Sequence, residues 1–415
     1  MWMIRIATLS SSALMSIETA RALGPVGRGL FVLPAIDVSI AVTFSVGLSS
    51  AASYYLLNRA AGRQIIRALI LGFALFTIVG SIATTLMGVI SHSVWAIGPA
   101  LTYMIFYAVY SIACGYYFGR DRARTAGIIN GALSLMTLVL VTFCIWGVQR
   151  SPWVALTGWV SAIGVVAISG LLFVISDARK LKGEDVDAVA VIRFGAKAGM
   201  LNVANLLNYR VDIYIVAMLL PVATVGLYTI AVTGAESALS LTLAVGQATL
   251  PRIGSLDRAR AGIFAARCLR NTLFFAAILC SIGTLGAPLV IRVLFGHAYA
   301  PIVMPMRVLL VGIVAASTGS IVSNYFVLNL GRAKVPLTTS VLSTVLCGII
   351  SVILIPRLGM LGAAVASTIA YLVSQAVAIS YFCKISGIGV AKVLFLDRQD
   401  LALFRRIALR AVRMS

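Results

Sequence analysis

Charged residues are scarce in this chain, and acidic residues are the scarcest of them. Of its 415 residues, 12 are Asp or Glu, 33 are Lys or Arg and two are His, whereas 61% are hydrophobic. Only 11% are charged, against about a quarter in a soluble globular domain, so the composition excludes that class. It predicts an all-α polytopic membrane protein with about a dozen spans of ~20 residues and no sizeable soluble domain.

The sequence also lacks the motifs of familiar enzymes. It has no Walker-type phosphate loop and no GxSxG, HExxH or paired-cysteine pattern. The six cysteines show no metal-ligand spacing. His92 and His297 lie near the ends of predicted spans, which does not suit a proton relay through the membrane centre. We therefore expect no enzyme, no metal site and no resident cofactor, while coupling to Na+ or H+ stays open.

The apolar runs predict twelve spans and an orientation. The spans cover residues 3–20, 30–57, 68–91, 94–118, 128–148, 153–175, 198–220, 226–250, 272–296, 303–329, 337–355 and 360–383. With the N-terminus inside, alternation places most Lys and Arg on the cytoplasmic side, as the positive-inside rule requires. Both termini are then cytoplasmic. Because the basic residues sit between apolar runs, the net charge of +21 indicates topology and not nucleic-acid binding.

Two halves are visible in the order of the chain. The longest internal connection, 176–197, is interpreted as a cytoplasmic linker between an N-terminal six-helix lobe, 1–175, and a C-terminal one, 198–383. GPVGRGLFVL at 24–33 resembles LPVATVGLYTI at 220–230, and GRDRA at 119–123 resembles GRAKV at 331–335. Such a duplication predicts two pseudo-symmetric lobes with a site at their interface and alternating access. The basic tail, 384–415, is either an amphipathic helix on the inner leaflet or a disordered segment.

The seventh predicted span carries polar residues where lipid-compatible ones are expected: Asn202, Asn205, Asn208, Arg210 and Asp212. At ~100° per residue, Asn202, Asn205 and Asp212 share one stripe. Arg210 lies about 200° from Asp212, so the two are not simple partners within the helix. Either neighbouring helices neutralise these charges as packing contacts, or the charges serve a ligand in a cavity. We favour the ligand.

Five further charged residues fall inside or beside predicted spans. Asp37 follows Pro34, where a kink can expose carbonyl oxygens to a cation; a carboxylate reaching the outer interface is the alternative. Glu236 is a candidate partner for Arg210 or a proton-binding group. The others are Glu18 in the first span and Arg28 and Arg307 toward the outer side. Both guanidinium groups suit a diphosphate, with lipid head groups as the alternative.

A family resemblance lies in the same region. The stretch LNYRVDIYIVAMLLPVATVGLYTIAVTGAESALSLTLAVGQATLPRI at 207–253, together with ARALGPVGRGLF at 20–31, resembles the polysaccharide-transporter family of Wzx-type repeat-unit flippases. The likeness extends loosely over the whole chain. It implies two six-helix lobes around a central cavity, the fold of multidrug and toxic-compound extrusion (MATE) transporters and lipid II flippases, and a bacterial inner membrane.

The resemblance also implies a substrate and roles for residues. The substrate is an undecaprenyl-diphosphate-linked oligosaccharide, moved to the outer leaflet for polysaccharide biosynthesis, with a polymerase and chain-length proteins as partners. The substrate candidates are Arg210, Arg307, Asn205, Asn208 and Arg28; the ion-coupling or charge-partner candidates are Asp212, Glu236, Asp37 and Glu18. The alternatives are a cation-coupled small-molecule exporter on the same fold and a membrane scaffold for polysaccharide assembly enzymes.

Overall fold

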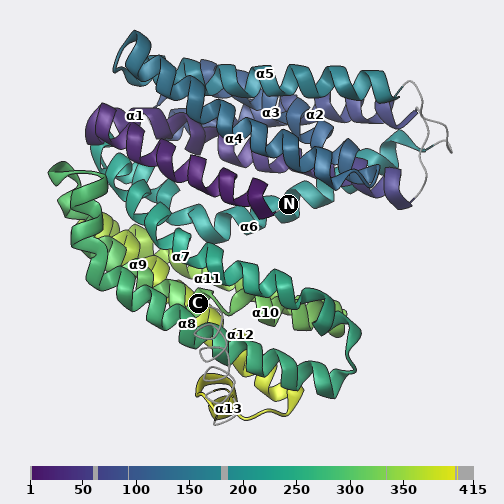
Figure 1. Cartoon of the computed structure of the whole chain (residues 1–415), viewed down its shortest axis with the longest axis vertical. Helices are drawn as coiled ribbons and strands as arrows, with labels where there is room; N and C mark the ends of the chain where they lie inside the picture. The colour runs from purple at the N-terminus through teal and green to yellow at the C-terminus, as the bar shows by residue number, and fades with distance from the viewer. Residues whose placement is uncertain are drawn as a thin grey trace, which may run out of the picture. The chain divides into compact units, whose positions relative to one another are not determined.

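The computed structural model describes residues 2–58, 64–91, 93–178, 186–332, 334–397 and 400, and its regular structure there is helical, with no strand (Figure 1). The long helices are α1 (Trp2–Asn58), α2 (Gln64–Ile90), α3 (Ile97–Gly119), α4 (Ala123–Phe143), α5 (Pro152–Ala178), α6 (Ala188–Leu219), α7 (Val222–Ser255), α8 (Arg258–Leu294), α9 (Val303–Ala316), α11 (Lys334–Leu358) and α12 (Met360–Ser386). Two short helices are α10 (Gly319–Asn324) and α13 (Val390–Leu394).

Each of the twelve predicted spans lies on these helices. Ten helical segments of the described residues are long and apolar enough to cross a membrane, so the chain is a multi-pass membrane protein. The number of membrane-crossing segments, ten, differs from the twelve predicted spans for two reasons. Helix α1 covers two predicted spans in one assignment, and α6 is not among the ten because its Asn, Arg and Asp residues lower its hydropathy.

The connection between the first two predicted spans, residues 21–29, is shorter in the structure than the span limits indicate. Helical structure continues from Trp2 to Asn58 and is interrupted only at Gly24, where φ is 67° and ψ is 179°. Glycine accepts this positive φ without a steric penalty. Pro25 follows and lacks an N–H, so it suits the first turn of the helical segment that restarts there. The chain therefore turns within two residues.

Two other predicted spans differ in their limits, each for a local reason. Helix α6 begins at Ala188, ten residues before the predicted 198, because the Asp187 carboxylate accepts hydrogen bonds from the N–H groups of Val189 (3.0 Å) and Ala190 (3.3 Å). The predicted span 303–329 breaks between α9 and α10 at Ser317 and Thr318, whose hydroxyls bond back to carbonyls of α9. In the tail, α13 is helical, and residues 401–415 lie outside the described part.

The helices group into two units by their contacts. Unit 1 comprises the chain to Leu227 together with Leu294–Ala298, and unit 2 comprises Tyr228–Val293 and the chain from Tyr299. Helix α6 lies in unit 1, where it packs on α1 and α2, although the predicted lobe boundaries assign it to the second half. The division into lobes 1–175 and 198–383 stays a prediction.

Helix α1 is the centre of unit 1 and packs against α2, α3, α4 and α6 (Figure 1). At its closest approach to α6, a Cβ on Gly47 would overlap the Gly195 carbonyl and lie 2.5 Å from Gly199 N. The two segments that resemble each other in sequence also touch. A Cβ on Gly29 would overlap the Val222 carbonyl, and one on Gly226 would overlap the Pro25 carbonyl. Such small-residue contacts let membrane helices approach closely.

Unit 2 has its own core at the end that carries α13. Tyr325, Phe326 and Phe382 are fully buried, with the Tyr325 and Phe382 ring centroids 5.0 Å apart. Leu269 of α8 and Val393 of α13 are buried in the same cluster. This core fixes the ends of α8, α10 and α12 and the short helix α13 relative to one another.

Replacing Gly47 by Ala is expected to destabilise the protein by about 1–3 kcal/mol, because the added methyl group collides with the backbone of α6 and the helices must separate. Gly98→Ala is the matched control: it is also in a helix, but a Cβ there meets nothing within 4 Å, so we expect no loss. Thermal unfolding of the purified protein in one detergent measures both. Equal behaviour of the two variants would contradict this account of the α1–α6 contact.

Candidate functional site

The polar residues of α6 differ in their burial. Asp212 is buried, and its Oδ1 accepts a hydrogen bond from the N–H of Ile213 at 2.8 Å. Asn202, Asn208 and Arg210 are half-buried, and Asn205 is exposed. The Oδ1 atom of Asn208 is buried without a hydrogen-bond partner among the described residues. A buried polar atom of this kind in a membrane-spanning helix calls for water or a ligand.

An apolar groove lies beside these residues. It encloses about 390 Å³ between α1, α2 and α6, and its α6 wall consists of Met200, Val203, Ala204 and Leu207. Residues at this spacing share one helix face. Met200 is 67% exposed, so the groove opens on the surface of unit 1. Helix α6 therefore presents a hydrocarbon-lined groove and a row of polar side chains on adjoining faces.

Asp37 is the most enclosed of the predicted carboxylates, at 2% exposure on α1. It accepts hydrogen bonds from Ser91 Oγ at 2.8 Å and from Ser93 Oγ, and the two serine hydroxyls lie 2.7 Å apart. Both serines follow the end of α2. The backbone at Pro34 keeps helical dihedral angles, because α1 departs from them only at Gly24. Two hydroxyl donors, and not freed carbonyls, surround this carboxylate.

Sequence reasoning missed the link between Asp37 and α6. Ser39, two residues after Asp37, shares a 2.6 Å hydrogen bond with the hydroxyl of Tyr214, two residues after Asp212. The structure thus brings the neighbourhoods of two predicted carboxylates together in unit 1. The pair of serines that flanks His92 was a visible signal for a cluster at the end of α2, whereas no pattern in the sequence indicated the contact of Ser39 with Tyr214.

Arg28 and Glu18 make contacts that organise the first part of α1. The Arg28 guanidinium is buried and donates to Thr19 Oγ1 at 2.5 Å and to Ser16 Oγ at 3.4 Å, so it bridges the break at Gly24. Glu18 accepts hydrogen bonds from Thr142 Oγ1 at 2.5 Å and from Trp146 Nε1 at 2.8 Å. These contacts tie α1 together and to the end of α4, and the predicted substrate and coupling roles stay predictions.

The remaining candidates belong to unit 2. Arg307 of α9 is half-buried, and its Nε donates to the Thr284 carbonyl of α8 at 2.9 Å. Glu236 of α7 is half-buried, and its main-chain carbonyl accepts a hydrogen bond from Ser240 Oγ at 3.1 Å. The hydrogen bond of Arg307 holds its guanidinium group against α8. The hydrogen bond of Ser240 lies within α7 and does not involve the Glu236 carboxylate.

Comparison with known proteins identifies the fold. No protein-family model matches the chain, and no curated protein sequence matches it. Among solved structures, it is similar to the lipid II flippase MurJ in an inward closed conformation, with a TM-score of 0.73 at 14% identity over 93% of this chain and 90% of that one. An inward-facing multidrug resistance MATE family transporter of the MOP superfamily has a TM-score of 0.72 at 16% identity, over 92% and 95%.

A third similar structure is a MOP superfamily transporter from Pyrococcus furiosus, described by a reversed polarity of its binding pocket that suggests a different function. Its TM-score is 0.61 at 17% identity, over 92% of this chain and 94% of that one. The chain therefore has the MATE-like membrane fold that the sequence predicts. Identities this low establish the fold alone, because one fold hosts many functions.

Removing both hydroxyls around Asp37 is expected to destabilise the protein. In the double variant Ser91→Ala, Ser93→Ala the buried carboxylate loses two donors, each worth about 1.5–3 kcal/mol to a charged acceptor. Ser50→Ala in α1 is the control, since that hydroxyl bonds only to the Val46 carbonyl of its own helix. Thermal unfolding in detergent compares them. A double variant as stable as the control would show that the serines do not hold the carboxylate.

Proposed function

We propose that the chain is a flippase that moves an undecaprenyl-diphosphate-linked oligosaccharide from the inner to the outer leaflet of the bacterial inner membrane by alternating access. The product serves surface or extracellular polysaccharide biosynthesis. The observation that carries the proposal is on α6, where Leu207 and Ala204 line an apolar groove of about 390 Å³. Arg210 follows Leu207, and Asn208 follows Ala204, by about one helical turn.

An amphiphilic substrate requires both kinds of surface. The guanidinium of Arg210 can donate two parallel hydrogen bonds to a diphosphate, a geometry that lysine does not reproduce. The amides of Asn205 and Asn208 suit sugar hydroxyls as donors and acceptors. The groove walled by Met200, Val203, Ala204 and Leu207 suits the first isoprene units of the lipid. A polar solute would not fill this apolar groove, and a purely apolar solute would not use the charge of Arg210.

Asp37 is our candidate for coupling to an ion. Its carboxylate is enclosed with two serine hydroxyls that donate to it. A hydroxyl that rotates can instead present its oxygen, either as a ligand to a cation or as an acceptor to a proton donor. The Ser39–Tyr214 hydrogen bond connects this cluster to α6, two residues from Asp212. Asp37 thus lies two residues from a contact between α1 and the helix that we assign to the substrate. Asp212, Glu236 and Glu18 are further coupling or partner candidates.

The similar structures support transport of this kind without deciding the substrate. MurJ is named as a lipid II flippase, so its cargo is a lipid-linked glycan. Chains of this fold also include transporters named for multidrug resistance, with nearly the same TM-score. We expect a polysaccharide polymerase and chain-length proteins as functional partners, and both termini on the cytoplasmic side.

A cation-coupled small-molecule exporter on the same fold is the second candidate. It is favoured by the buried carboxylate of Asp37, which is chemically suited to cation coupling. It is disfavoured by Arg210, because a fixed positive charge within the substrate region repels the cationic drugs that such exporters move. Drug susceptibility of cells that express the wild-type chain separates the two, since a flippase should leave it unchanged.

Arg210→Ala is expected to lower glycan display at the cell surface by at least about tenfold, because a charge-assisted hydrogen bond of about 1.5–3 kcal/mol to the diphosphate is lost. Arg210→Lys should recover part of the activity through charge alone. The measurement is surface glycan in cells that lack their own flippase, at matched membrane levels of each variant. Arg357→Ala, which removes an exposed arginine at the end of α11, is the control.

Normal display with both Arg210 variants would make this arginine structural and would return the exporter to first place. Loss in Arg357→Ala as well would show that the assay responds to general charge removal and not to the α6 site.

A further inference from the structure

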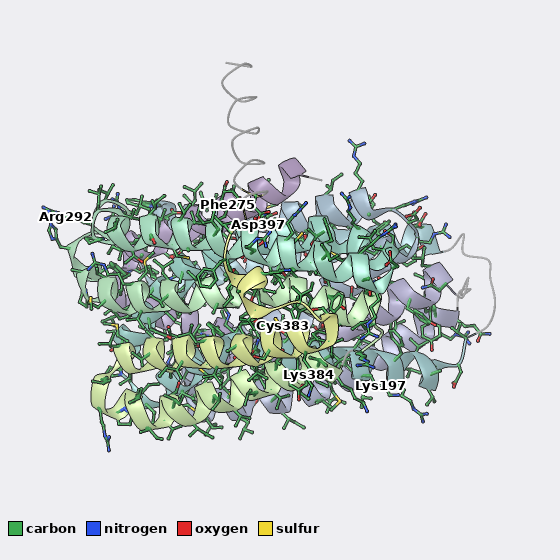
Figure 2. All side chains as sticks on the ribbon, turned by 90° about the horizontal axis from the view of Figure 1, so that it is seen from below. Lys197, Phe275, Arg292, Cys383, Lys384 and Asp397 are labelled. Carbon is green, nitrogen blue, oxygen red and sulfur yellow. The ribbon has the colours of Figure 1, made fainter. Side chains whose placement is uncertain are left out.

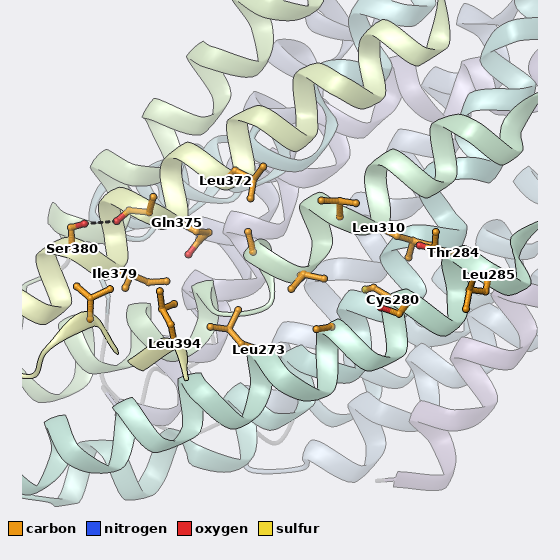
Figure 3. A pocket seen from close by; sticks show the side chains of 17 residues that line it. Leu273, Cys280, Thr284, Leu285, Leu310, Leu372, Gln375, Ile379, Ser380 and Leu394 are labelled. Atoms are coloured by element: carbon orange, nitrogen blue, oxygen red, sulfur yellow. Dashed lines mark hydrogen bonds between the residues drawn. The ribbon is translucent and has the colours of Figure 1, made fainter. Parts of the chain in front are cut away.

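Unit 2 contains a larger cavity that the proposed function does not use. It encloses about 780 Å³ between α8, α9 and α12 and is bordered at one end by α13 (Figure 3). Leu273, Ser281 and Leu285 of α8 line one side, Leu310 of α9 and Leu372 of α12 line the other, and Leu394 of α13 lines the end. The lining is mostly apolar, and its polar members are Ser281, Thr284, Gln375 and Ser380.

The cavity opens toward the surface that a membrane covers. Leu285 is 79% exposed, Val311 54% and Leu372 45%, and all three belong to helical segments able to cross a membrane. Water gains little in an apolar space of this kind, because it finds few hydrogen-bond partners there. A hydrocarbon chain from the bilayer is the occupant that matches both the lining and the opening.

Short helix α13 is held against one end of this cavity by an ionic anchor. Arg270 of α8 is buried, donates to the Lys392 carbonyl at 2.7 Å and pairs with Asp400, which is 1% exposed. Arg267 lies 3.7 Å from the same carboxylate. The anchor holds α13, whose Val390 and Leu394 line the cavity, so charged contacts position this border.

Exposed basic side chains surround that same end. Lys384 follows Ser380, a lining residue of α12, by one helical turn and is exposed at the end of the helix (Figure 2). Arg258 donates to the neighbouring Ile385 carbonyl at 3.1 Å. Lys392 is exposed on α13. Basic residues grouped where apolar helices leave the membrane attract anionic lipid head groups, each by about 1 kcal/mol.

We propose that this cavity is a binding site for an anionic phospholipid. One hydrocarbon chain lies between α8, α9 and α12, and the phosphate lies at the α13 end against Lys384, Lys392 and Arg258. The site is independent of the substrate groove in unit 1, because every lining residue belongs to unit 2. It is expected to prefer phosphatidylglycerol to phosphatidylcholine, since the two share their chains and differ in net charge.

Native mass spectrometry of the full chain in detergent, titrated with phosphatidylglycerol or phosphatidylcholine, tests both halves of the site. Ser281→Trp fills the cavity and should weaken phosphatidylglycerol binding by about tenfold or more, since displacing two methylene groups from apolar contact suffices for that ratio. Ile282→Trp is the matched control, because Ile282 is 62% exposed on the same helix and does not line the cavity.

The contribution of the basic residues to lipid binding is tested at exposed side chains. Lys384→Gln with Lys392→Gln should weaken phosphatidylglycerol binding by about 25-fold, the product of two charges worth about fivefold each, and should leave phosphatidylcholine binding unchanged. Arg193→Gln with Lys197→Gln removes two exposed charges from α6 in unit 1 and should have no effect.

Equal binding of the two lipids by the wild type, or equal losses in the two tryptophan variants, would overturn the proposal. So would displacement of phosphatidylglycerol by undecaprenyl phosphate together with loss of glycan display in Ser281→Trp, because the cavity would then belong to the substrate. Retained display in Ser281→Trp with lost lipid binding supports a separate lipid site, and failure of the Arg210 test alone does not affect it.

Discussion

Close backbone packing along α1 is the contact on which unit 1 depends. In a membrane, burying apolar side chains gives helices no advantage over lipid, so association rests on dispersion contacts and on hydrogen bonds between helices. Gly47 brings α1 against α6, and Gly29 and Gly226 bring the two similar motifs against each other. These approaches fix where the polar residues of α1 and α6 lie, and through them the geometry of the candidate site.

Two buried charged groups of α1 are bonded to hydroxyls in the contacts that the structure describes. Asp37 uses Ser91 and Ser93, and Arg28 uses Thr19 and Ser16. A hydroxyl both donates and accepts, so it can follow a change in the charge of its partner without moving the backbone. This makes the Asp37 cluster suitable for a coupling ion, whereas Arg28 beside the break at Gly24 is placed to stabilise the turn.

Both units combine an apolar space with a cationic border, but on different scales. In unit 1, Arg210 lies one helical turn beyond Leu207, which lines a groove of about 390 Å³. In unit 2, Lys384 and Lys392 lie near Ser380, Val390 and Leu394, which line a cavity of about 780 Å³. Each suits a lipid with a phosphate-containing head group. The groove in unit 1 lies on α6, whose side-chain amides can recognise sugars. The cavity in unit 2 is bordered by α13, which Arg270 and Asp400 hold in place. A substrate path and a structural lipid site are thereby distinguished by chemistry.

The sequence by itself determined the class of protein and the approximate helical ranges, because apolar runs of about 20 residues and their basic flanks report directly on a bilayer. The family resemblance of its motifs gave the fold. It also singled out Asp37 and the polar residues of α6. Only the tertiary structure decided what those residues touch: the serines around Asp37, the contact of Ser39 with Tyr214, and both lipid-sized spaces. Such contacts join residues distant in the chain, and they depend on helix rotation and depth, which hydropathy does not encode.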